Sequence, residues 1–364
     1  MKEHTLTMEN QNNLLTERLL AWYRVHARDL PWRRTCDPYR IWVSEIMLQQ
    51  TRVAAVLGYY ARFLEAFPTV EALAAADEEK LLKCWEGLGY YSRARNLQKA
   101  ARIVTEQYTG CFPADYAKLL ELPGIGDYTA GAIASAAFGV PVPAVDGNVL
   151  RVMTRLTDCH EDITLPDTKK LARAWVLTHM PTEPEDIRVF NQALMELGAT
   201  VCGPNAAPCC EDCPLKELCL GHLRDTAELL PVKAVKKARQ TENMTVYVMM
   251  REGRIALRKR PETGLLAGLW EFPHVPGALE ETAAAAPVEA WGLSVGIWQQ
   301  KLTAKHIFTH REWHMIGYVL RVTGEGPGEF RWVDAADLED CAVPSAFARY
   351  LETARKLLEE EGML

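Results

Sequence analysis

The sequence contains no apolar run long enough to cross a membrane, and its polar first residues do not form a signal peptide. Its longest uncharged run, residues 128–145, is interrupted by two glycines and two prolines. A buried helix followed by a loop is the structure that we expect for this run. We therefore predict a cytoplasmic protein without membrane association, and we expect it to be a monomer.

Positive charge is also scarce, because 41 Lys and Arg stand against 48 Asp and Glu and give a net charge of −7. A uniformly basic surface, the common footprint of nucleic-acid-binding proteins, is therefore excluded. Residues 231–260 depart from this balance, with nine Lys or Arg and only two acids. This segment could follow a phosphate backbone or form a solvated linker, and charge alone does not decide between the two.

Strand-like alternation is absent before residue 240. Up to about residue 223, apolar residues recur at spacings of three and four, as in IWVSEIMLQQTRVAAVLGYYARFLEAF, which predicts helices. Beyond residue 240, TVYVMM and HMIGYVLRV predict short strands, and FARYLETARKLLEEE predicts a closing helix. The length suits two domains. We predict an all-α domain over residues 1–228, a basic linker over 229–243 and a small α+β domain over 244–364.

Ten cysteines are many for a cytosolic chain, in which disulfides rarely persist. Five of them follow the pattern Cys202-x7-Cys210-x2-Cys213-x5-Cys219, with Cys209 beside Cys210. This spacing lets four thiolates converge on a metal centre, either an iron–sulfur cluster or a structural zinc ion. The two-residue gap before Cys213 favours Cys210 over Cys209 as a ligand. Spacing leaves that choice, and the identity of the metal, open.

A glycine-rich turn lies between two helical segments in LPGIGDYTAGAI, residues 122–133. Gly124 and Gly126 allow a tight turn with outward-facing amides, and the following helix begins with its positive dipole end on the same side. Such a turn can hold a phosphate group without a basic side chain. A lone PGxG motif would favour an ordinary packing corner between two helices. The full string LPGIGDYTAGAI is far more specific than that short motif.

The sequence resembles the helix-hairpin-helix DNA glycosylases that carry a [4Fe–4S] cluster. The resemblance is carried by the string LPGIGDYTAGAI, the segment VDGNVLRV (residues 145–152) and the cysteine quartet. PWR (31–33) and WVSEIMLQQTRV (42–53) resemble the adenine DNA glycosylase branch of that superfamily. The resemblance implies a helix-hairpin-helix glycosylase domain with a cluster loop over residues 202–219. It also implies double-stranded DNA with adenine opposite 8-oxoguanine or guanine as the substrate.

Individual roles follow from the same resemblance. Glu45 matches the catalytic acid, and Asp146 matches the aspartate that stabilises the sugar cation, with Tyr128 and Asn148 supporting the site. The residues expected to contact the substrate or the DNA are Arg33, Gln50, Tyr90, Gly124, Gly126, Gln192, Phe308, Thr309 and His310. Gln192 matches a residue that contacts adenine, Gln50 and Tyr90 match side chains inserted into the duplex, and Phe308–Thr309–His310 matches a loop that reads 8-oxoguanine. The [4Fe–4S] ligands implied are Cys202, Cys210, Cys213 and Cys219.

The sequence around the two acids supports this chemistry independently of the resemblance. In a helix over residues 40–56, Glu45 lies on an apolar face, which should raise its pKa and keep it protonated near neutral pH. Asp146 precedes an apolar-periodic helix and suits the N-cap position, where amides favour the ionised form. A buried structural glutamate and a purely capping aspartate are the plainer alternatives.

Departures from the family pattern refine the prediction. The gap after Cys202 is one residue longer than the commonest spacing, and Thr309 stands where serine is common. Tyr128 occupies the place of the lysine that the endonuclease III type uses as a nucleophile, which predicts a monofunctional enzyme without Schiff-base chemistry. An endonuclease III-like lyase and an inactive DNA-binding protein are the alternatives.

The C-terminal domain resembles a Nudix hydrolase through GLLAGLWEFP, residues 264–273. The acid-rich metal-binding helix of that fold is absent after Pro273, because EETAAAAPVEAWGL offers too few carboxylates. We therefore predict a Nudix-like domain that recognises the lesion and hydrolyses no nucleotide.

Overall fold

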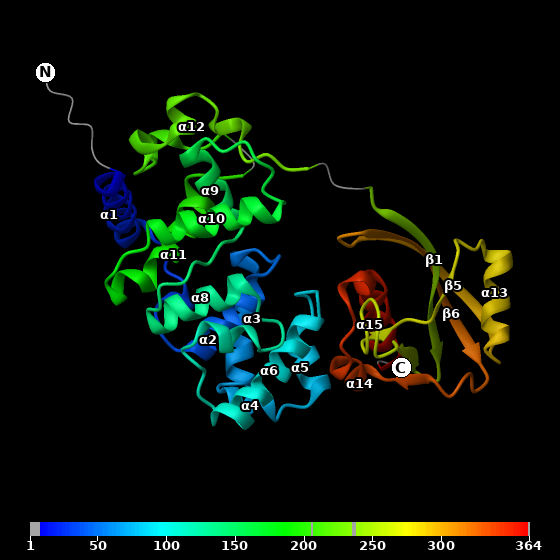
Figure 1. Ribbon diagram of the computed structural model, residues 1–364. Coiled ribbons are helices and arrows are strands. Elements are labelled where there is room, and N and C mark those ends of the chain that lie inside the picture. The colour runs from blue at the N-terminus through cyan, green and yellow to red at the C-terminus, as the bar shows by residue number, and fades with distance from the viewer. Residues whose placement is uncertain (1–7, 205–206, 235–237, 363–364) are drawn as a thin grey trace, which may run out of the picture. The chain divides into compact units, whose positions relative to one another are not determined.

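A computed structural model describes residues 8–204, 207–234 and 238–362 (Figure 1). By internal contacts the chain divides into two units, Met1–Ala75 with Asn96–Val235 and Ala76–Arg95 with Lys236–Leu364. Lys236 and Lys237 of the basic stretch lie outside the described residues. No helix in the described ranges is long and apolar enough to cross a membrane.

The first unit is helical, as the apolar spacing predicts. Its helices are α1 (Met8–His26), α2 (Pro38–Leu48), α3 (Val53–Ala66), α4 (Val70–Ala74), most of α6 (Ser92–Tyr108), α7 (Tyr116–Leu120), α8 (Asp127–Phe138), α9 (Gly147–Thr157), α10 (Pro166–Thr178), α11 (Pro184–Thr200) and α12 (Leu220–Leu223). Short 3-10 turns, including η1 (Pro31–Arg33), connect them. Helix α5 (Glu78–Trp85) belongs to the second unit.

Helix α11 is the centre of the helical packing, since α1, α8 and α9 all contact it. Leu19, Val149 and Phe190, from α1, α9 and α11, are fully buried in one core cluster. At Gly198 the backbones of α9 and α11 come so close that a Cβ atom would lie 2.7 Å from the Cβ of Asn148. This close approach fixes the start of α9, where Asp146 and Asn148 lie, against the end of α11.

The second unit contains a seven-stranded mixed sheet in the order β3-β2-β1-β6-β5, with β4 paired to β1 and β7 paired to β2. The strands are β1 (Gln240–Arg251), β2 (Arg254–Lys259), β3 (Trp270–Glu271), β4 (His274–Pro276), β5 (Ser294–Ile307), β6 (Arg311–Thr323) and β7 (Phe330–Val333). Strands β1 and β6 run parallel, and the other pairs are antiparallel. This architecture confirms the predicted α+β domain.

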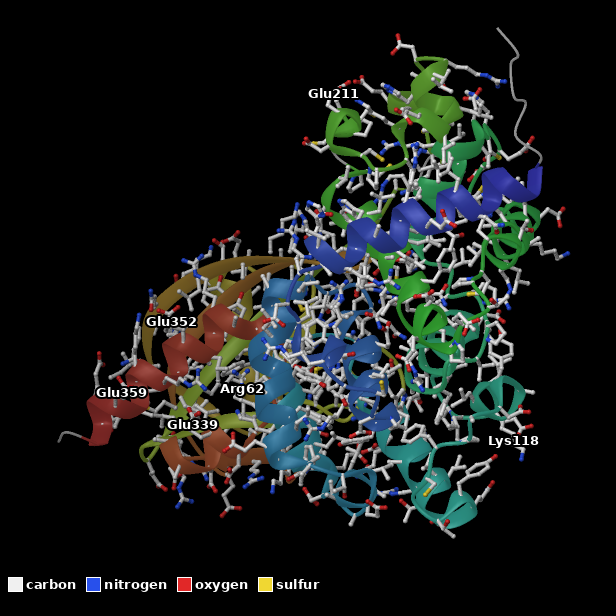
Figure 2. The ribbon with its side chains drawn as sticks, turned by 90° about the vertical axis from the view of Figure 1, so that its left-hand side faces the viewer. Arg62, Lys118, Glu211, Glu339, Glu352 and Glu359 are labelled. Atoms are coloured by element: carbon white, nitrogen blue, oxygen red, sulfur yellow. The ribbon has the colours of Figure 1, made fainter. Side chains whose placement is uncertain are left out.

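Alternation along β1 divides the core of the sheet between its two faces. Val246 and Val248 belong to the cluster under α14 (Ala335–Asp340) and α15 (Ala348–Gly362), whereas Tyr247 and Met249 belong to the cluster under α13 (Glu281–Ala290) (Figure 1). The opposite side of α15 is polar, and Glu352 and Glu359 point outward from it (Figure 2). Helices thus cover both faces of the sheet.

Candidate active site

A cleft in the helical unit brings together most of the site residues that the sequence predicts for that part of the chain. Its walls come from η1, α2, α8, α11 and the start of α9. The predicted residues that line it are Arg33, Glu45, Gln50, Tyr128, Asp146, Asn148 and Gln192. Segments far apart in the sequence therefore contribute to one hollow that contains both predicted acids.

Glu45 lies on α2 among residues that are nearly all buried, and it is only 8% exposed. The Tyr128 hydroxyl donates a 2.7 Å hydrogen bond to its Oε2 atom. Burial raises the pKa of Glu45 to about 7, and Asp146 acts in the same direction, while the Tyr128 hydrogen bond and Arg33 oppose the shift. A carboxyl group with this pKa is largely protonated below neutral pH, which confirms the physical expectation for an acid on an apolar helix face.

Asp146 has a different environment, because it is the N-cap residue of α9. Its Oδ1 accepts from the amides of Asn148 and Val149 at 2.9 and 2.8 Å, and its Oδ2 accepts from Asn148 Nδ2 at 2.6 Å. Burial raises the pKa of Asp146, and these donors oppose the shift by stabilising the ionised form. Asp146 thus accepts three hydrogen bonds where Glu45 accepts one, so of the two acids Asp146 is the better placed to remain ionised.

A buried ion-pair network fixes Arg33 at the edge of the cleft. Glu196 on α11 is fully buried, and it accepts hydrogen bonds from Arg28 Nε and Nη2 and from Arg33 Nη2, each at 2.7 Å. Burial acts to raise the pKa of Glu196, but these bonds outweigh it and lower the pKa to about 2. Tyr23 lies beside Arg33 and donates a 2.8 Å hydrogen bond to the Gln192 side-chain oxygen.

Sequence reasoning missed Glu196, Arg28 and Tyr23. The available signal was the one charged residue in the segment FNQALMELG, four residues after Gln192. Spacing shows that such a glutamate shares a helix face with Gln192. It cannot show that two arginines from η1 and the segment before it complete the pair, because these are brought close only by tertiary packing.

The residues predicted to enter the duplex have unusual backbone conformations. Gln50 and Tyr90 have φ angles of +58° and +47°, in the left-handed region that non-glycine residues rarely adopt. Each costs roughly 1–2 kcal/mol relative to a relaxed backbone. Both side chains are exposed, and Tyr90 is 45% exposed.

Within the second unit, Tyr90 contacts the predicted recognition loop. Its hydroxyl lies 2.6 Å from Thr309 Oγ1. Phe308, Thr309 and His310 form the turn between β5 and β6, where Thr309 and His310 are exposed and Phe308 packs on Trp313. The turn therefore anchors one apolar side chain and presents the two polar ones.

The predicted hairpin lies between α7 and α8. Gly124 has a φ of +80°, which only glycine adopts without strain, and a Cβ there would lie 2.8 Å from Asn96 Cβ. Gly126 is the N-cap of α8 and offers no capping side chain, and nothing lies within 4 Å of where its Cβ would be. The start of α8 thus has no side-chain cap, and the space beside Gly126 is open, as a phosphate-binding turn requires.

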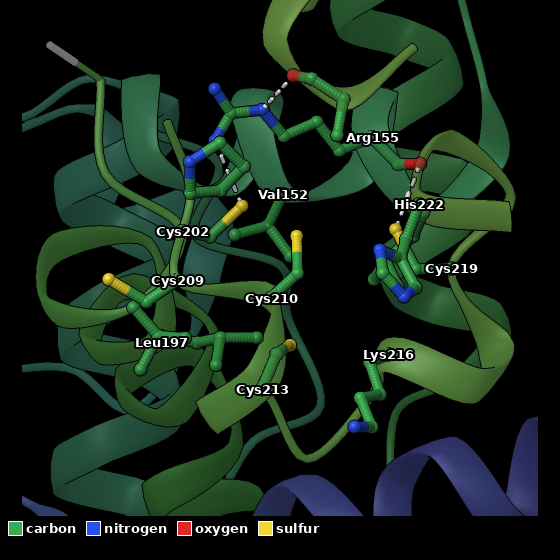
Figure 3. A pocket seen from close by; sticks show the side chains of 14 residues that line it. Val152, Arg155, Leu197, Cys202, Cys209, Cys210, Cys213, Lys216, Cys219 and His222 are labelled. Atoms are coloured by element: carbon green, nitrogen blue, oxygen red, sulfur yellow. Dashed lines mark hydrogen bonds between the residues drawn. The ribbon is translucent and has the colours of Figure 1, made fainter. Parts of the chain in front are cut away.

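The cysteine cluster surrounds a pocket beside α9 and α11 (Figure 3). The thiols of Cys202, Cys210, Cys213 and Cys219 are directed into it, whereas the thiol of Cys209 points away (Figure 3). All ten cysteines have free thiols, and in the described residues no group of three or more Cys, His, Asp or Glu side chains could hold a metal ion as they stand.

Arginines of α9 bind the backbone of this cysteine loop. Arg155 Nη1 donates to the Gly203 carbonyl at 3.0 Å and lies 3.2 Å from Cys202 Sγ. Arg151 donates to Cys202 O at 2.7 Å and to Asn148 Oδ1 at 2.8 Å. The loop is thus attached to the helix that begins at Asp146.

Comparisons with known proteins agree with this geometry. Residues 43–177 match the family model of HhH-GPD superfamily base excision DNA repair proteins, and residues 245–353 match that of the NUDIX domain. A thermostable thymine-DNA glycosylase superposes with a TM-score of 0.53 at 30% identity, over 59% of this chain and 97% of its own. A trapped endonuclease III–DNA covalent intermediate superposes with a TM-score of 0.51 at 25% identity, over 60% and 99%. Fold and cleft therefore define a helix-hairpin-helix DNA glycosylase of base-excision repair with a Nudix-like domain.

Curated relatives identify the branch. An adenine DNA glycosylase of Rattus norvegicus is 35% identical over 394 residues, covering 91% of this chain and 76% of the relative. One from Buchnera aphidicola is 31% identical, covering 85% of this chain and 87% of the relative. The chain belongs to the adenine DNA glycosylase family, which confirms the resemblance found in the sequence.

Proposed function

We propose that this DNA glycosylase hydrolyses the N-glycosidic bond of adenine mispaired with 8-oxoguanine or guanine, and that it leaves an abasic site. The observation that carries the proposal is the pair of carboxyl groups in one cleft, Glu45 with a pKa of about 7 and Asp146 capping α9. Hydrolysis of a glycosidic bond needs an acid for the leaving group and a negative charge beside the sugar cation.

In this mechanism, protonated Glu45 gives its proton to the adenine ring as the bond between the base and the sugar breaks. The bonding electrons leave with the base, and the sugar becomes an oxocarbenium ion. Ionised Asp146 stabilises that cation at close range, in a site whose burial strengthens the interaction. Water then adds to the sugar carbon and releases one proton, which leaves an abasic site.

The remaining cleft residues hold the flipped-out base. Gln192, whose amide oxygen accepts from Tyr23, offers its amide to the edge of adenine, and Arg33 is fixed beside it by Glu196. Extrusion of a base costs a few kcal/mol. Gln50 and Tyr90 occupy the gap in the duplex, and their strained backbones hold the side chains ready for it.

The DNA is held by backbone and loop contacts rather than by a basic surface. The hairpin amides after Gly124 and Gly126 bind a phosphate group. Phe308, Thr309 and His310 read the 8-oxoguanine opposite the adenine, and the Tyr90–Thr309 hydrogen bond links the residue that enters the duplex to the residue that reads the lesion. We propose that the enzyme acts as a monomer on such mispairs.

Monofunctional action is the first prediction. Tyr128 stands where a lysine nucleophile would be, and its hydroxyl is bonded to Glu45, so no amine can attack the sugar there. On labelled duplexes with adenine opposite 8-oxoguanine, the adenine strand should break only after alkali. Borohydride should trap no stoichiometric enzyme–DNA adduct, and a parallel thymine-glycol duplex should stay intact. Alkali-independent scission or a trapped adduct would move the protein to the lyase branch.

We further propose that Cys202, Cys210, Cys213 and Cys219 hold a [4Fe–4S] cluster. The observation that supports the proposal is that the four thiols line one pocket, in a chain that resembles the cluster-carrying glycosylases. A cluster in this place ties the loop together next to α9. Its redox chemistry is not needed for hydrolysis.

The neighbouring cysteines offer a matched test of the ligand set. Cys210→Ser should lower the iron content and the visible cluster absorbance of the purified protein by half or more. Cys209→Ser should leave both unchanged, because the Cys209 thiol points away from the pocket (Figure 3). The reverse pattern would show that Cys209 is the ligand. A purified protein with about one zinc ion per chain and no iron would show that the site is a structural zinc site instead of a cluster.

A further inference from the structure

The Tyr128 hydroxyl has two acceptors in the cleft. It lies 2.7 Å from Glu45 Oε2 and 3.2 Å from the Met195 sulfur. Met195 is half-buried on α11, one turn after Gln192 and next to Glu196. No role falls to this methionine in the mechanism described above.

A tyrosine hydroxyl carries one proton, so it can donate to only one of these acceptors at a time. When Glu45 is ionised, Tyr128 donates to the carboxylate. When Glu45 is protonated, its O–H faces the base that it protonates, and the neutral carboxyl is a weaker acceptor for Tyr128 than the carboxylate is. The Tyr128 hydroxyl can then turn from Glu45 Oε2 to a second acceptor. The Met195 sulfur is the acceptor placed to receive it, as thioethers do weakly.

We propose that Met195 is a positioning residue that stabilises the protonated form of Glu45 by accepting the Tyr128 hydroxyl proton. While Glu45 carries its proton, the Tyr128 hydroxyl donates to the Met195 sulfur. Once Glu45 has given that proton to the base, the Tyr128 hydroxyl rotates to stabilise the new carboxylate. This inference rests on the proposed role of Glu45 as the acid.

Other charged groups also face Glu45 and influence its pKa. Asp146, from the start of α9, favours the protonated form, and Arg33, from η1, favours the ionised form. Glu196, on α11, is compensated by its pairs with Arg28 and Arg33. None of these groups is altered by a substitution at Met195 that preserves volume.

The expected effect is a shift in the pH profile of base release. In Met195→Leu the Tyr128 hydroxyl has lost the sulfur acceptor and donates to the Glu45 carboxyl group. The ionised form of Glu45 is then stabilised relative to the protonated form, so the pKa of Glu45 falls. The pH midpoint at which the single-turnover rate falls on the alkaline side should move about half a pH unit to one pH unit lower. Above that midpoint the rate should be roughly three- to tenfold lower than in the wild type. The rate at low pH should change little.

Tyr128→Phe provides the sharper comparison. It removes the donor to the carboxylate and should move the midpoint the opposite way, toward higher pH. Adding Met195→Leu to Tyr128→Phe should then cause no further shift, because no hydroxyl is left for the sulfur to accept from. The matched control is Met153→Leu, which changes a fully buried methionine of α9 and should leave the profile unchanged.

The outcomes separate two failures. An unmoved midpoint in Met195→Leu, or an equal shift in the Tyr128→Phe background, would overturn the inference while leaving the proposed function intact. Wild-type protein that releases no adenine at any pH would overturn the proposed function itself. If a variant folds poorly, titration of the ¹³C-labelled Glu45 carboxyl in its folded fraction should give the same direction of shift.

Discussion

Replacing Glu45 by glutamine should abolish adenine release while the protein still binds DNA containing the mispair. Glutamine preserves the shape of the side chain and can still accept from Tyr128, but it has no proton to give to the base. Loss of a general acid costs on the order of 10²–10⁴-fold in rate. The measurement is the single-turnover rate of base release, together with a binding titration on the same duplex.

Glu106→Gln is a matched control for this substitution. Glu106 lies exposed on α6, so its variant should react and bind like the wild type. A Glu45→Gln protein that retained base release within a few-fold of the wild type would exclude Glu45 as the acid. Loss of binding as well as release would instead indicate that the buried carboxyl has a structural role.

Asp146→Ser should separate the two roles of Asp146. Serine is also a good N-cap, so α9 should keep a hydrogen bond to its first amides. The negative charge beside the sugar cation is lost, and we expect a fall of roughly 10²–10³-fold in the rate of base release. The melting temperature should change little.

Asp146→Ala completes the comparison, because it removes both the charge and the cap. Its rate should fall as in the serine variant, and its free energy of unfolding should fall by a further ~1 kcal/mol. A serine variant with nearly normal activity would show that capping is the whole function of Asp146. The plainer interpretation of the sequence would then be the right one.

Much of this site could be predicted from local sequence. The helical period around Glu45 placed an acid on an apolar face, and the structure confirms that it is buried with a raised pKa. The extent of that helix was wrong, because α2 ends at Leu48 and α3 begins only at Val53. The pattern before α9 predicted the Asp146 cap, which is also confirmed. These predictions succeed because a helix period and an N-cap are properties of a few consecutive residues.

The supporting contacts could not be predicted in this way. Glu196 and Arg33 are distant in sequence, and the Met195 sulfur meets Tyr128 only because α8 and α11 pack together. The positive φ angles of Gln50 and Tyr90 have no composition signal, since neither residue is one that favours that conformation. Tertiary packing, not local preference, sets these features.

The decisive measurement is the chromatographic yield of free adenine from a duplex with adenine opposite 8-oxoguanine, followed from about pH 5 to about pH 9. It tests whether the protein releases adenine with Glu45 as the acid. Glu45 acts as an acid in its protonated form, so a pKa of about 7 predicts a rate that falls as pH rises through that value. Asp146 acts in its ionised form, and burial raises its pKa, so the rate should also fall at the acid end once Asp146 is protonated. Free adenine should appear in an amount equal to the abasic sites formed, with this loss on the alkaline side. No free adenine at any pH, or release that increases above neutral pH, would contradict it.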